Sequence, residues 1–188
     1  MMRSLLFTLL LAFSVSANAE GFSYDYVSFG YGTVDLDGVS DSGDGFVLGA
    51  ALGLTDSVHL FAGYDDADVS SSVGVSRWSA GVGYNTPMSD TFDLFGRLSY
   101  ESIDFDTPLG GADDSGFGAT IGARLRAGNQ IEVNAAINYV DYSDFGDDTG
   151  FEVGMLYDFN SNWSAGLSGE WSDDVTTYSI GARYFFGK

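Results

Sequence analysis

The sequence predicts an all-β protein: a closed, antiparallel, up-and-down transmembrane β-barrel of about ten strands, with eight strands as the alternative. Three observations support this fold class. Apolar residues alternate with small or polar residues in one segment after another, each of about ten residues. Aromatic residues bound the apolar face of many segments, as expected for two interfacial girdles. No hydrophobic stretch after residue 20 is long enough for a spanning helix, and a closed barrel is the other way to satisfy a backbone inside a membrane.

The first residues have the features of an export signal. Arg3 gives a basic start, residues 5–15 form a mostly apolar run, and residues 17–19 (Ala-Asn-Ala) supply the small-x-small pattern that a signal peptidase cleaves. The apolar run is too short for a transmembrane helix, which needs roughly 20 residues. We therefore expect a signal peptide at residues 1–19 and an outer-membrane β-barrel domain at residues 20–188.

The composition excludes several classes of protein. Twenty-seven acidic residues against seven basic ones give a net charge of −20. This argues against nucleic-acid binding, because phosphate contacts need Lys and Arg. The absence of cysteine removes disulfides, thiol catalysis and Cys-ligated metals. An aromatic content of 15% argues against a disordered chain.

The parity of the apolar residues locates the expected strands. The apolar residues have even numbers in residues 46–54, 58–64, 78–84 and 92–100. They have odd numbers in residues 117–125, 131–139, 151–159 and 163–171, and even numbers again in residues 178–186. A soluble barrel would alternate too, but its outer face needs plentiful charge. Here the polar face is mostly Gly, Ser, Thr and Asn, which favours a membrane barrel.

An aromatic first segment at residues 22–34 completes the expected set of about ten strands. Its parity is mixed, because Tyr24 and Tyr26 have even numbers whereas Val27, Phe29 and Tyr31 have odd ones. A β-bulge inserts one residue and thereby reverses the faces. The sequence therefore predicts a bulge near Tyr26.

The connections predict the orientation of the barrel. They are short after every second segment, at residues 55–57, 85–91, 128–130 and 160–162. The opposite connections hold 17 of the 27 acids, namely Asp35, Asp37, Asp41, Asp44, Asp65, Asp66, Asp68, Asp104, Asp106, Asp113, Asp114, Asp141, Asp144, Asp147, Asp148, Asp173 and Asp174. Short turns face the periplasm in such barrels. We therefore expect acidic extracellular loops and two periplasmic termini.

The parity of the apolar residues also predicts the turn and the register of one hairpin. Directly opposed residues share a face, so their numbers must sum to an even value where residues 117–125 meet residues 131–139. A three-residue turn at residues 128–130 satisfies this and pairs Ala127 with Ile131 and Arg126 with Glu132. Such turns commonly need a left-handed residue, and Gly128 or Asn129 can supply it.

All five arginines after residue 20 fall on the non-aromatic parity. An Arg that faces lipid near the midplane costs about 2–4 kcal/mol, so these side chains are expected in the lumen. The expected lumen charge network is Arg77, Asp93, Arg97, Glu101, Arg124, Arg126, Glu132, Glu152, Asp158, Glu170 and Arg183. Two interpretations stay open: a charged constriction in a narrow channel, or a salt-bridged filling of a closed interior.

No catalytic, cofactor or metal site is expected. His59, the single histidine, lies beside a short turn at the periplasmic end, which favours a polar lumen or interfacial residue over a general base. Asp35-x-Asp37-Gly38 is similar to the start of a calcium loop, but Val39 and Phe46 occupy ligand positions. The expected partners are outer-membrane lipid and lipopolysaccharide, with weakly bound Ca²⁺ or Mg²⁺ at the acidic loops, around a monomeric barrel.

Three segments, residues 23–27 (SYDYV), 59–64 (HLFAGY) and 78–85 (WSAGVGYN), resemble a family of small Gram-negative outer-membrane proteins. That family has been discussed in connection with quorum sensing and host perception, and it belongs with the OmpA-like barrels. The resemblance covers most of residues 20–188 but rests on strand and girdle patterns, so it implies fold and outer-membrane location. Outer-membrane barrels usually end on an aromatic residue, whereas Phe186 is followed here by Gly187 and Lys188.

The expected function is an integral outer-membrane barrel with a structural or narrow porin-like role. The alternative is a surface recognition or adhesion protein that acts through its acidic loops. An enzyme is not expected.

Overall fold

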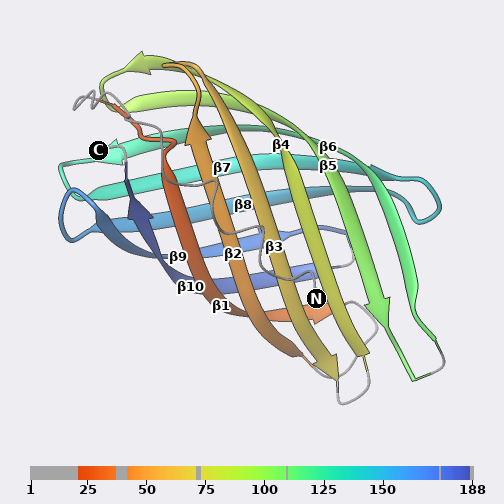
Figure 1. Cartoon of the computed structure of the whole chain (residues 1–188). Helices are drawn as coiled ribbons and strands as arrows, with labels where there is room; N and C mark the ends of the chain where they lie inside the picture. The colour runs from red at the N-terminus through yellow and green to blue at the C-terminus, as the bar shows by residue number, and fades with distance from the viewer. Residues whose placement is uncertain (1–20, 37–41, 71–72, 109, 174, 187–188) are drawn as a thin grey trace, which may run out of the picture.

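Ten antiparallel strands close into one barrel in the computed structural model, which describes residues 21–36, 42–70, 73–108, 110–173 and 175–186. The strands are β1 (Tyr26–Leu36), β2 (Gly43–Gly53), β3 (Val58–Ser70), β4 (Val73–Ser89), β5 (Phe92–Asp106), β6 (Ala112–Ala127), β7 (Ile131–Tyr142), β8 (Gly146–Asp158), β9 (Trp163–Trp171) and β10 (Val175–Phe185). Each pairs with its neighbours in the chain, and β1 pairs with β10 to complete the wall (Figure 1). The predicted fold class is confirmed with ten strands, while the predicted signal peptide lies outside the described residues.

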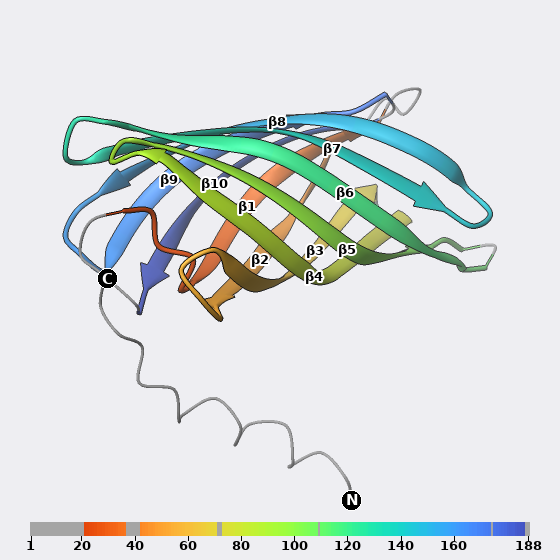
Figure 2. The same cartoon turned by 90° about the horizontal axis from the view of Figure 1, so that it is seen from above.

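The strands are strongly inclined and wrap around a common interior, as the two perpendicular views show (Figures 1 and 2). Closure leaves no free strand edge, which is the requirement for a sheet in lipid. No helix within the described ranges is both long and apolar enough to cross a membrane.

The aromatic and aliphatic parity faces outward on every strand. Leu98, Phe117, Ile121 and Ile180 are 65–72% exposed although they are large and apolar. An apolar surface of this extent is unfavourable in water and marks contact with lipid. The opposite parity points into the lumen, where it meets charged and small residues.

The predicted bulge near Tyr26 is wrong. β1 runs from Tyr26 without a register shift, with Tyr26 opposite Phe185 on one side and Ala51 on the other. Tyr24 and Tyr26 are 6% and 8% exposed because they face the interior, whereas Val27, Phe29 and Tyr31 face outward. The change of parity therefore separates two sets of aromatic residues on opposite faces and needs no inserted residue.

One of the expected short connections differs in the structure. β4 continues through residues 85–89, which had been predicted as turn, and only Asp90 and Thr91 connect it to β5. A register shift lies between Pro87 and Ser89, where the proline cannot donate to the ladder. By contrast, the predicted pairs Ala127 with Ile131 and Arg126 with Glu132 are confirmed, and Gly128 supplies the left-handed residue with a φ of 77°.

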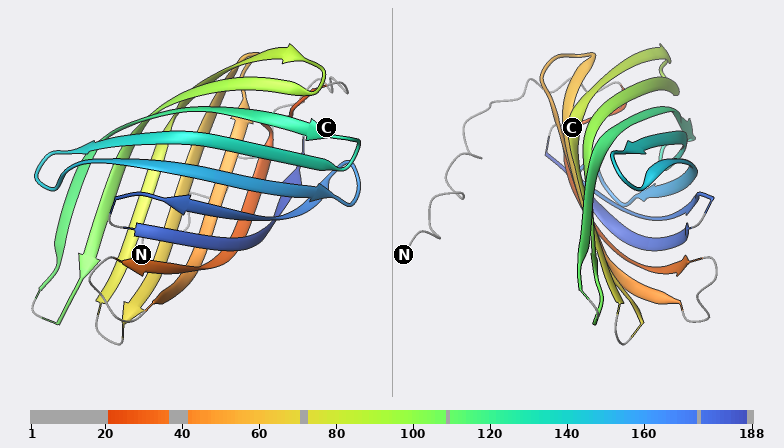
Figure 3. Two further views of the ribbon diagram at one scale, coloured as in Figure 1. Left: turned by 180° about the vertical axis from the view of Figure 1, so that it is seen from behind. Right: turned by 90° about the vertical axis from the view of Figure 1, so that its right-hand side faces the viewer.

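At the end of the barrel that bears the acidic residues, the strands are longer than the alternation of the sequence suggested. β4, β5 and β6 have 17, 15 and 16 residues, against 9 in β9. The hairpin of β5 and β6 projects at this end (Figure 3). Many of the acids that were predicted in loops therefore lie on strands: Asp35, Asp44, Asp65, Asp66, Asp68, Asp104, Asp106, Asp113, Asp114, Asp141, Asp147 and Asp148. Asp37, Asp41 and Asp174 lie outside the described residues.

Adjacent substitutions on β6 test which face meets lipid. Ile121→Lys places a charge on the outer face, where 68% of the residue is exposed, and we expect it to lower the free energy of unfolding by about 2–4 kcal/mol. The matched control Thr120→Lys points into the cavity of the lumen and should cost less. Urea unfolding in lipid vesicles measures both. An equal or reversed order would contradict this assignment of faces.

Candidate functional site

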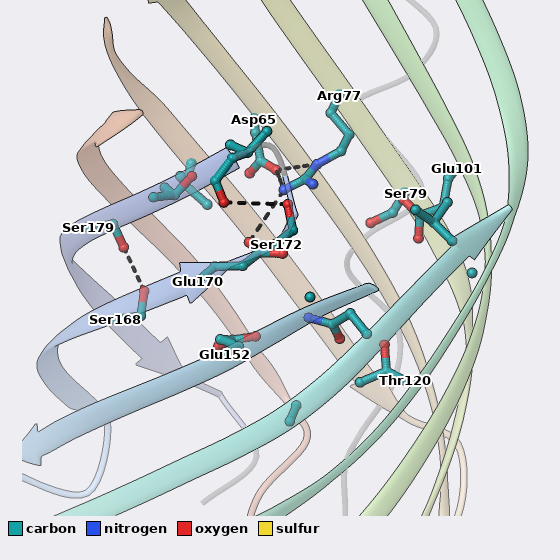
Figure 4. Close-up of a pocket in the computed structure, with 18 of the residues that line it drawn as sticks. Asp65, Arg77, Ser79, Glu101, Thr120, Glu152, Ser168, Glu170, Ser172 and Ser179 are labelled. Atoms are coloured by element: carbon teal, nitrogen blue, oxygen red, sulfur yellow. Dashed lines mark hydrogen bonds and ion pairs between the residues drawn. The ribbon is translucent and has the colours of Figure 1, made fainter. Parts of the chain in front are cut away.

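The lumen contains a cavity of about 460 Å³. Its lining extends from Phe105 and Val175, at the ends of their strands that lie opposite the short turns and are called outer from here on, to Arg124 and Glu132, near the short-turn ends of β6 and β7, which are called inner. Charged and hydroxyl side chains from several strands converge on it (Figure 4). The cavity is therefore the candidate site, and its floor lies toward the end of the barrel that bears the short turns.

The outer part of the cavity has one arginine among several carboxylates. Arg77 on β4 lies 2.9 Å from Asp65 on β3 and 3.6 Å from Glu170 on β9, so one guanidinium bridges facing parts of the wall (Figure 4). Asn134 donates a hydrogen bond to Glu152 at 3.2 Å. Glu101 accepts one from Ser99. This region therefore carries an excess of negative charge.

An inner ion-pair cluster, defined as Arg124, Arg126, Glu132 and Asp158, lies near the end of the barrel that bears the short turns. Arg124 Nε lies 2.8 Å from Glu132 Oε1, and their side chains are only 5% and 1% exposed. Arg126 reaches Glu132 at 3.8 Å and Asp158 at 3.3 Å. The register explains this contact set, because Arg126 is directly opposite Glu132 and Arg124 is its diagonal neighbour on the same face.

Residues 22–25, here named the N-terminal plug, lie in the inner end of the lumen. The Tyr24 hydroxyl donates to Asp93 at 2.8 Å. The Tyr24 ring stacks on His59 with ring centroids 4.1 Å apart. Arg124 donates to the carbonyl of Ser23 at 3.1 Å, and its guanidinium lies 4.9 Å from the centroid of the Phe22 ring. Burial raises the pKa of the Tyr24 hydroxyl, which keeps it protonated as the donor in this contact.

The plug is also bound to the wall through Asp25. The Asp25 carboxylate accepts a hydrogen bond from the backbone of Gly53 at 2.8 Å, and its carbonyl accepts one from Phe186 at 3.1 Å. These bonds attach the segment to β2 and to the end of β10. The plug is therefore held by both of the strands that flank β1.

His59 is fully buried beneath the plug. Its Nε2 accepts a hydrogen bond from Arg97 Nε at 3.2 Å, so that this nitrogen carries no proton, and its Nδ1 lies 3.4 Å from Asn85 Oδ1. A Cβ atom at Gly83 would lie 2.2 Å from His59 Nε2, so glycine makes room for the ring. Both ring nitrogens of His59 are therefore engaged with the protein.

Arg97 and Arg183 lie together at the floor of the cavity. Arg97 donates weakly to the Tyr26 hydroxyl at 3.5 Å, and the Arg183 guanidinium lies 4.1 Å from the centroid of the Tyr26 ring. Neither arginine forms an ion pair with a carboxylate of the described residues. The Nε of Arg183 is buried without a hydrogen-bond partner there.

Direct ion pairs and hydrogen bonds divide the residues of the expected charge network into groups, although Asp93 is directly opposite Arg124 in the pairing of β5 with β6. Arg77 joins Glu170, and the four residues of the inner ion-pair cluster join one another. The remaining members have other neighbours: Asp93 contacts the plug, Arg97 and Arg183 contact Tyr26, Glu101 contacts Ser99 and Glu152 contacts Asn134.

Sequence reasoning missed several residues of the site. Asp65 had been assigned to an outer loop, yet its odd number is the lumen parity of β3. The same rule places Tyr26 in the lumen, because Val27, Phe29 and Tyr31 carry the outward parity of β1. Phe22 precedes the first strand, and no periodic signal could have placed it. Within the part of the chain that the structure covers, no group of three or more His, Cys, Asp or Glu side chains could hold a metal ion.

Comparisons with known proteins give one family. The model of the outer membrane protein beta-barrel domain matches residues 5–159. No curated protein matches the chain. A solved structure of the KdgM porin in complex with disordered oligogalacturonate is 13% identical, with a TM-score of 0.49, and the match covers 85% of this chain and 99% of that one. The NanC porin is 11% identical, with a TM-score of 0.49 and coverage of 85% and 98%. Ail, the attachment invasion locus protein of Yersinia pestis, is 15% identical, with a TM-score of 0.42 and coverage of 86% and 97%.

Two glutamate variants compare the inner ion-pair cluster with the outer cavity. Glu132→Ala leaves Arg124 buried without its carboxylate, and we expect it to lower the free energy of unfolding by about 3–5 kcal/mol. Glu152→Ala removes a carboxylate that forms no ion pair with the described arginines and should cost clearly less. Urea unfolding in the same vesicles measures both. A larger loss with Glu152→Ala would show that the cluster does not stabilise the inner end.

Proposed function

This chain belongs to the family of outer membrane proteins with a β-barrel domain, and from that premise we propose that it is a narrow, porin-like channel whose inner mouth is closed by the N-terminal plug. The protein is located in the cell outer membrane. The observation that carries the proposal is the cavity of about 460 Å³, lined by charged, hydroxyl and apolar side chains, which extends inward from the outer strand ends and stops above the plug.

The wall of the lumen favours a space filled with water over a packed core. Lumen-facing positions at Gly81, Gly116 and Gly181 approach the backbone of the neighbouring strand so closely that a Cβ atom would meet it at 2.0, 1.9 and 2.4 Å. Small residues at these positions keep the wall thin and leave the interior open. Hydroxyl groups such as Ser168 and Ser179, whose oxygen atoms are 2.8 Å apart, add polar wall surface. A path lined this way suits small polar solutes.

The inner end of the barrel, in contrast to this open wall, is filled with side chains. The inner ion-pair cluster and the plug fill it with buried side chains, among which Glu132, Asp93 and His59 are at most 1% exposed. The two interpretations of the charged lumen therefore apply to different halves: a filled inner half and an open outer half. Passage requires the plug to move, which breaks the bond of Tyr24 to Asp93 and its stacking on His59.

The plug contacts are suited to reversible opening. They consist of one phenol–carboxylate hydrogen bond, one ring stack, cation–π contacts and a few backbone bonds. Each such contact contributes on the order of 0.5–3 kcal/mol, and water replaces part of each when the segment leaves. The ten-strand ladder does not depend on the plug, so the wall can stay closed while the segment moves. The proposal includes no catalytic step, because the ring nitrogens of His59 already contact Arg97 and Asn85.

We also propose that the outer rim contacts anionic lipopolysaccharide through divalent cations. The rim combines acids on the projecting strands, such as Asp104, Asp106 and Asp113, with a single nearby guanidinium, Arg77, that is already paired. Crowded carboxylates repel one another and attract counterions without a dedicated site. The barrel closes within one chain, which is compatible with a monomer.

Conductance of the refolded protein in planar bilayers tests the channel. We expect wild-type protein to show small or rare openings, because the plug closes the inner mouth. The double variant Phe22→Ala/Tyr24→Ala removes the two rings that fill it and should raise the mean conductance severalfold. Tyr31→Ala, an aromatic truncation on the lipid face, is the matched control and should leave conductance unchanged. If the double variant folds and still carries no current, the barrel is not a channel.

Chelation tests the outer rim. At low ionic strength we expect a chelator of divalent cations to lower the melting temperature of the barrel, because the rim carboxylates then repel one another. The effect should fade at 0.1 M salt, where charges are screened over about 10 Å. Thermal unfolding with and without chelator at two salt concentrations measures this. An unchanged melting temperature at low salt would remove divalent cations from the proposal.

A further inference from the structure

The floor of the cavity carries two positive charges that form no ion pair with a described carboxylate, although Glu132 and Glu152 interact with them at longer range. Arg97 and Arg183 both contact Tyr26, one through its hydroxyl and the other over its ring. Neither pairs with a carboxylate among the residues that the structure describes, and the Nε of Arg183 lacks a hydrogen-bond partner there. Like charges held close together in a partly desolvated space repel, and a buried donor without an acceptor is costly. This floor therefore favours the binding of an anionic group.

The wall above the floor has the opposite excess. Glu152 on β8 is directly opposite Glu170 on β9, with both side chains in the lumen. Like charges at directly opposed positions destabilise a sheet. Glu170 has Arg77 at 3.6 Å, whereas Glu152 accepts a hydrogen bond from Asn134 and has the two arginines of the floor only beyond ion-pair distance. Glu152 and Glu170, both labelled in Figure 4, therefore favour the binding of a cationic group between them.

The two charged groups, the arginines at the floor and the glutamates above them, lie at different depths of one cavity. Along β10 the residue opposite Glu170 is Thr177, and Arg183 lies six residues further toward the periplasmic end. Six strand residues span about 20 Å of wall. The long side chains that reach into the lumen shorten the separation of the charged groups, so that Glu152 still interacts with Arg97 and Arg183 without forming an ion pair. A ligand that satisfies both groups must carry its own two charges some distance apart.

We propose that the cavity binds short zwitterionic peptides of two or three residues. The carboxylate end lies on Arg97, Arg183 and the Tyr26 hydroxyl, and the ammonium end lies between Glu152 and Glu170. An extended peptide spans about 3.3–3.6 Å per residue, so two or three residues bridge such a gap. The cavity of about 460 Å³ lies within the range of roughly 300–1,000 Å³ typical of small-ligand sites.

The charges at the entrance favour a zwitterion over a simple anion. A solute that enters from outside passes Asp65, Asp148 and Glu101 before it reaches the floor. A purely anionic solute is repelled there, whereas the leading ammonium group of a zwitterion is attracted. The inference gives the proposed channel a ligand class, and it concerns binding alone, so its test does not require transport.

Three probes of nearly equal size test the proposal on the refolded barrel in detergent micelles by isothermal titration calorimetry. Triglycine carries both charges, N-acetyl-triglycine lacks the ammonium group, and triglycine amide lacks the carboxylate. We expect triglycine to bind and each singly charged relative to bind about tenfold more weakly or less, the loss of one charge-assisted contact. Equal binding of triglycine and N-acetyl-triglycine would reduce the site to an anion site, and an absence of heat with triglycine would overturn the proposal.

Two variants assign the ends of the ligand. Glu152→Gln should weaken triglycine about tenfold without weakening N-acetyl-triglycine, which has no ammonium group to lose. Arg183→Gln should weaken triglycine by a similar factor without weakening triglycine amide. Asp90→Asn, which removes one exposed charge at the turn between β4 and β5, is the control and should change neither. Variants that leave triglycine binding at the wild-type value would overturn the assignment.

Heat-modifiable migration on gels establishes that each variant is folded. Should Arg183→Gln fail to fold, Glu152→Gln and the three probes on the wild-type barrel still decide between the outcomes. Conductance without triglycine binding would reject the ligand class and leave the channel standing. Triglycine binding without conductance would reject the channel and leave the binding site.

Discussion

Antiparallel pairing of β1 with β10 is the constraint on which the rest of the molecule depends. Lipid offers no hydrogen bonds, so a ten-strand wall is stable there only when its first and last strands satisfy each other. Once the wall is closed, each side chain has one of two environments, and the period of two assigns it to lipid or lumen. Leu98 and Ile121 then cover the outside, and Arg97 and Thr120, opposite one another on β5 and β6, point inward. The polar interior is therefore a consequence of closure.

A closed wall of this size creates an interior that the chain must fill, hydrate or leave polar. The inner ion-pair cluster fills part of it, but Arg124 and Glu132 gain little net stability from each other, since desolvation offsets most of their attraction. The two residues depend on each other, because removing either one leaves the other as a buried charge without a partner. The Ser23 carbonyl and the Phe22 ring add contacts to the same guanidinium. The plug is thus positioned by a charge that the barrel already had to neutralise.

Most of the fold could be predicted from the parity of the apolar residues and from the turn residues, because both depend only on residues close together in the sequence. The hairpin of β6 and β7 followed from one even-sum rule and a glycine that could adopt a positive φ. The same rule, applied to Tyr26 and Asp65, would have placed both in the lumen, but the aromatic character of one and the acidic neighbourhood of the other suggested a bulge and a loop. The plug could not be predicted, because residues 22–25 have no strand period and are held by contacts distant in sequence, such as Tyr24 with Asp93. Tertiary contacts decided those positions.

The location of the plug links its formation to the closing step itself. Asp25 accepts from Phe186 and from Gly53, and the Tyr26 ring meets Phe185 at 5.9 Å between centroids. Gly53 comes from β2, the hairpin neighbour of β1, whereas Phe185 and Phe186 come from the last strand and its end, so they meet residues 25 and 26 only when β10 has reached β1. The segment that blocks the inner mouth is therefore fixed by the same event that removes the free edges of the sheet. A barrel of this design closes its wall and its inner mouth together, and only the weaker contacts of the plug are then free to open again.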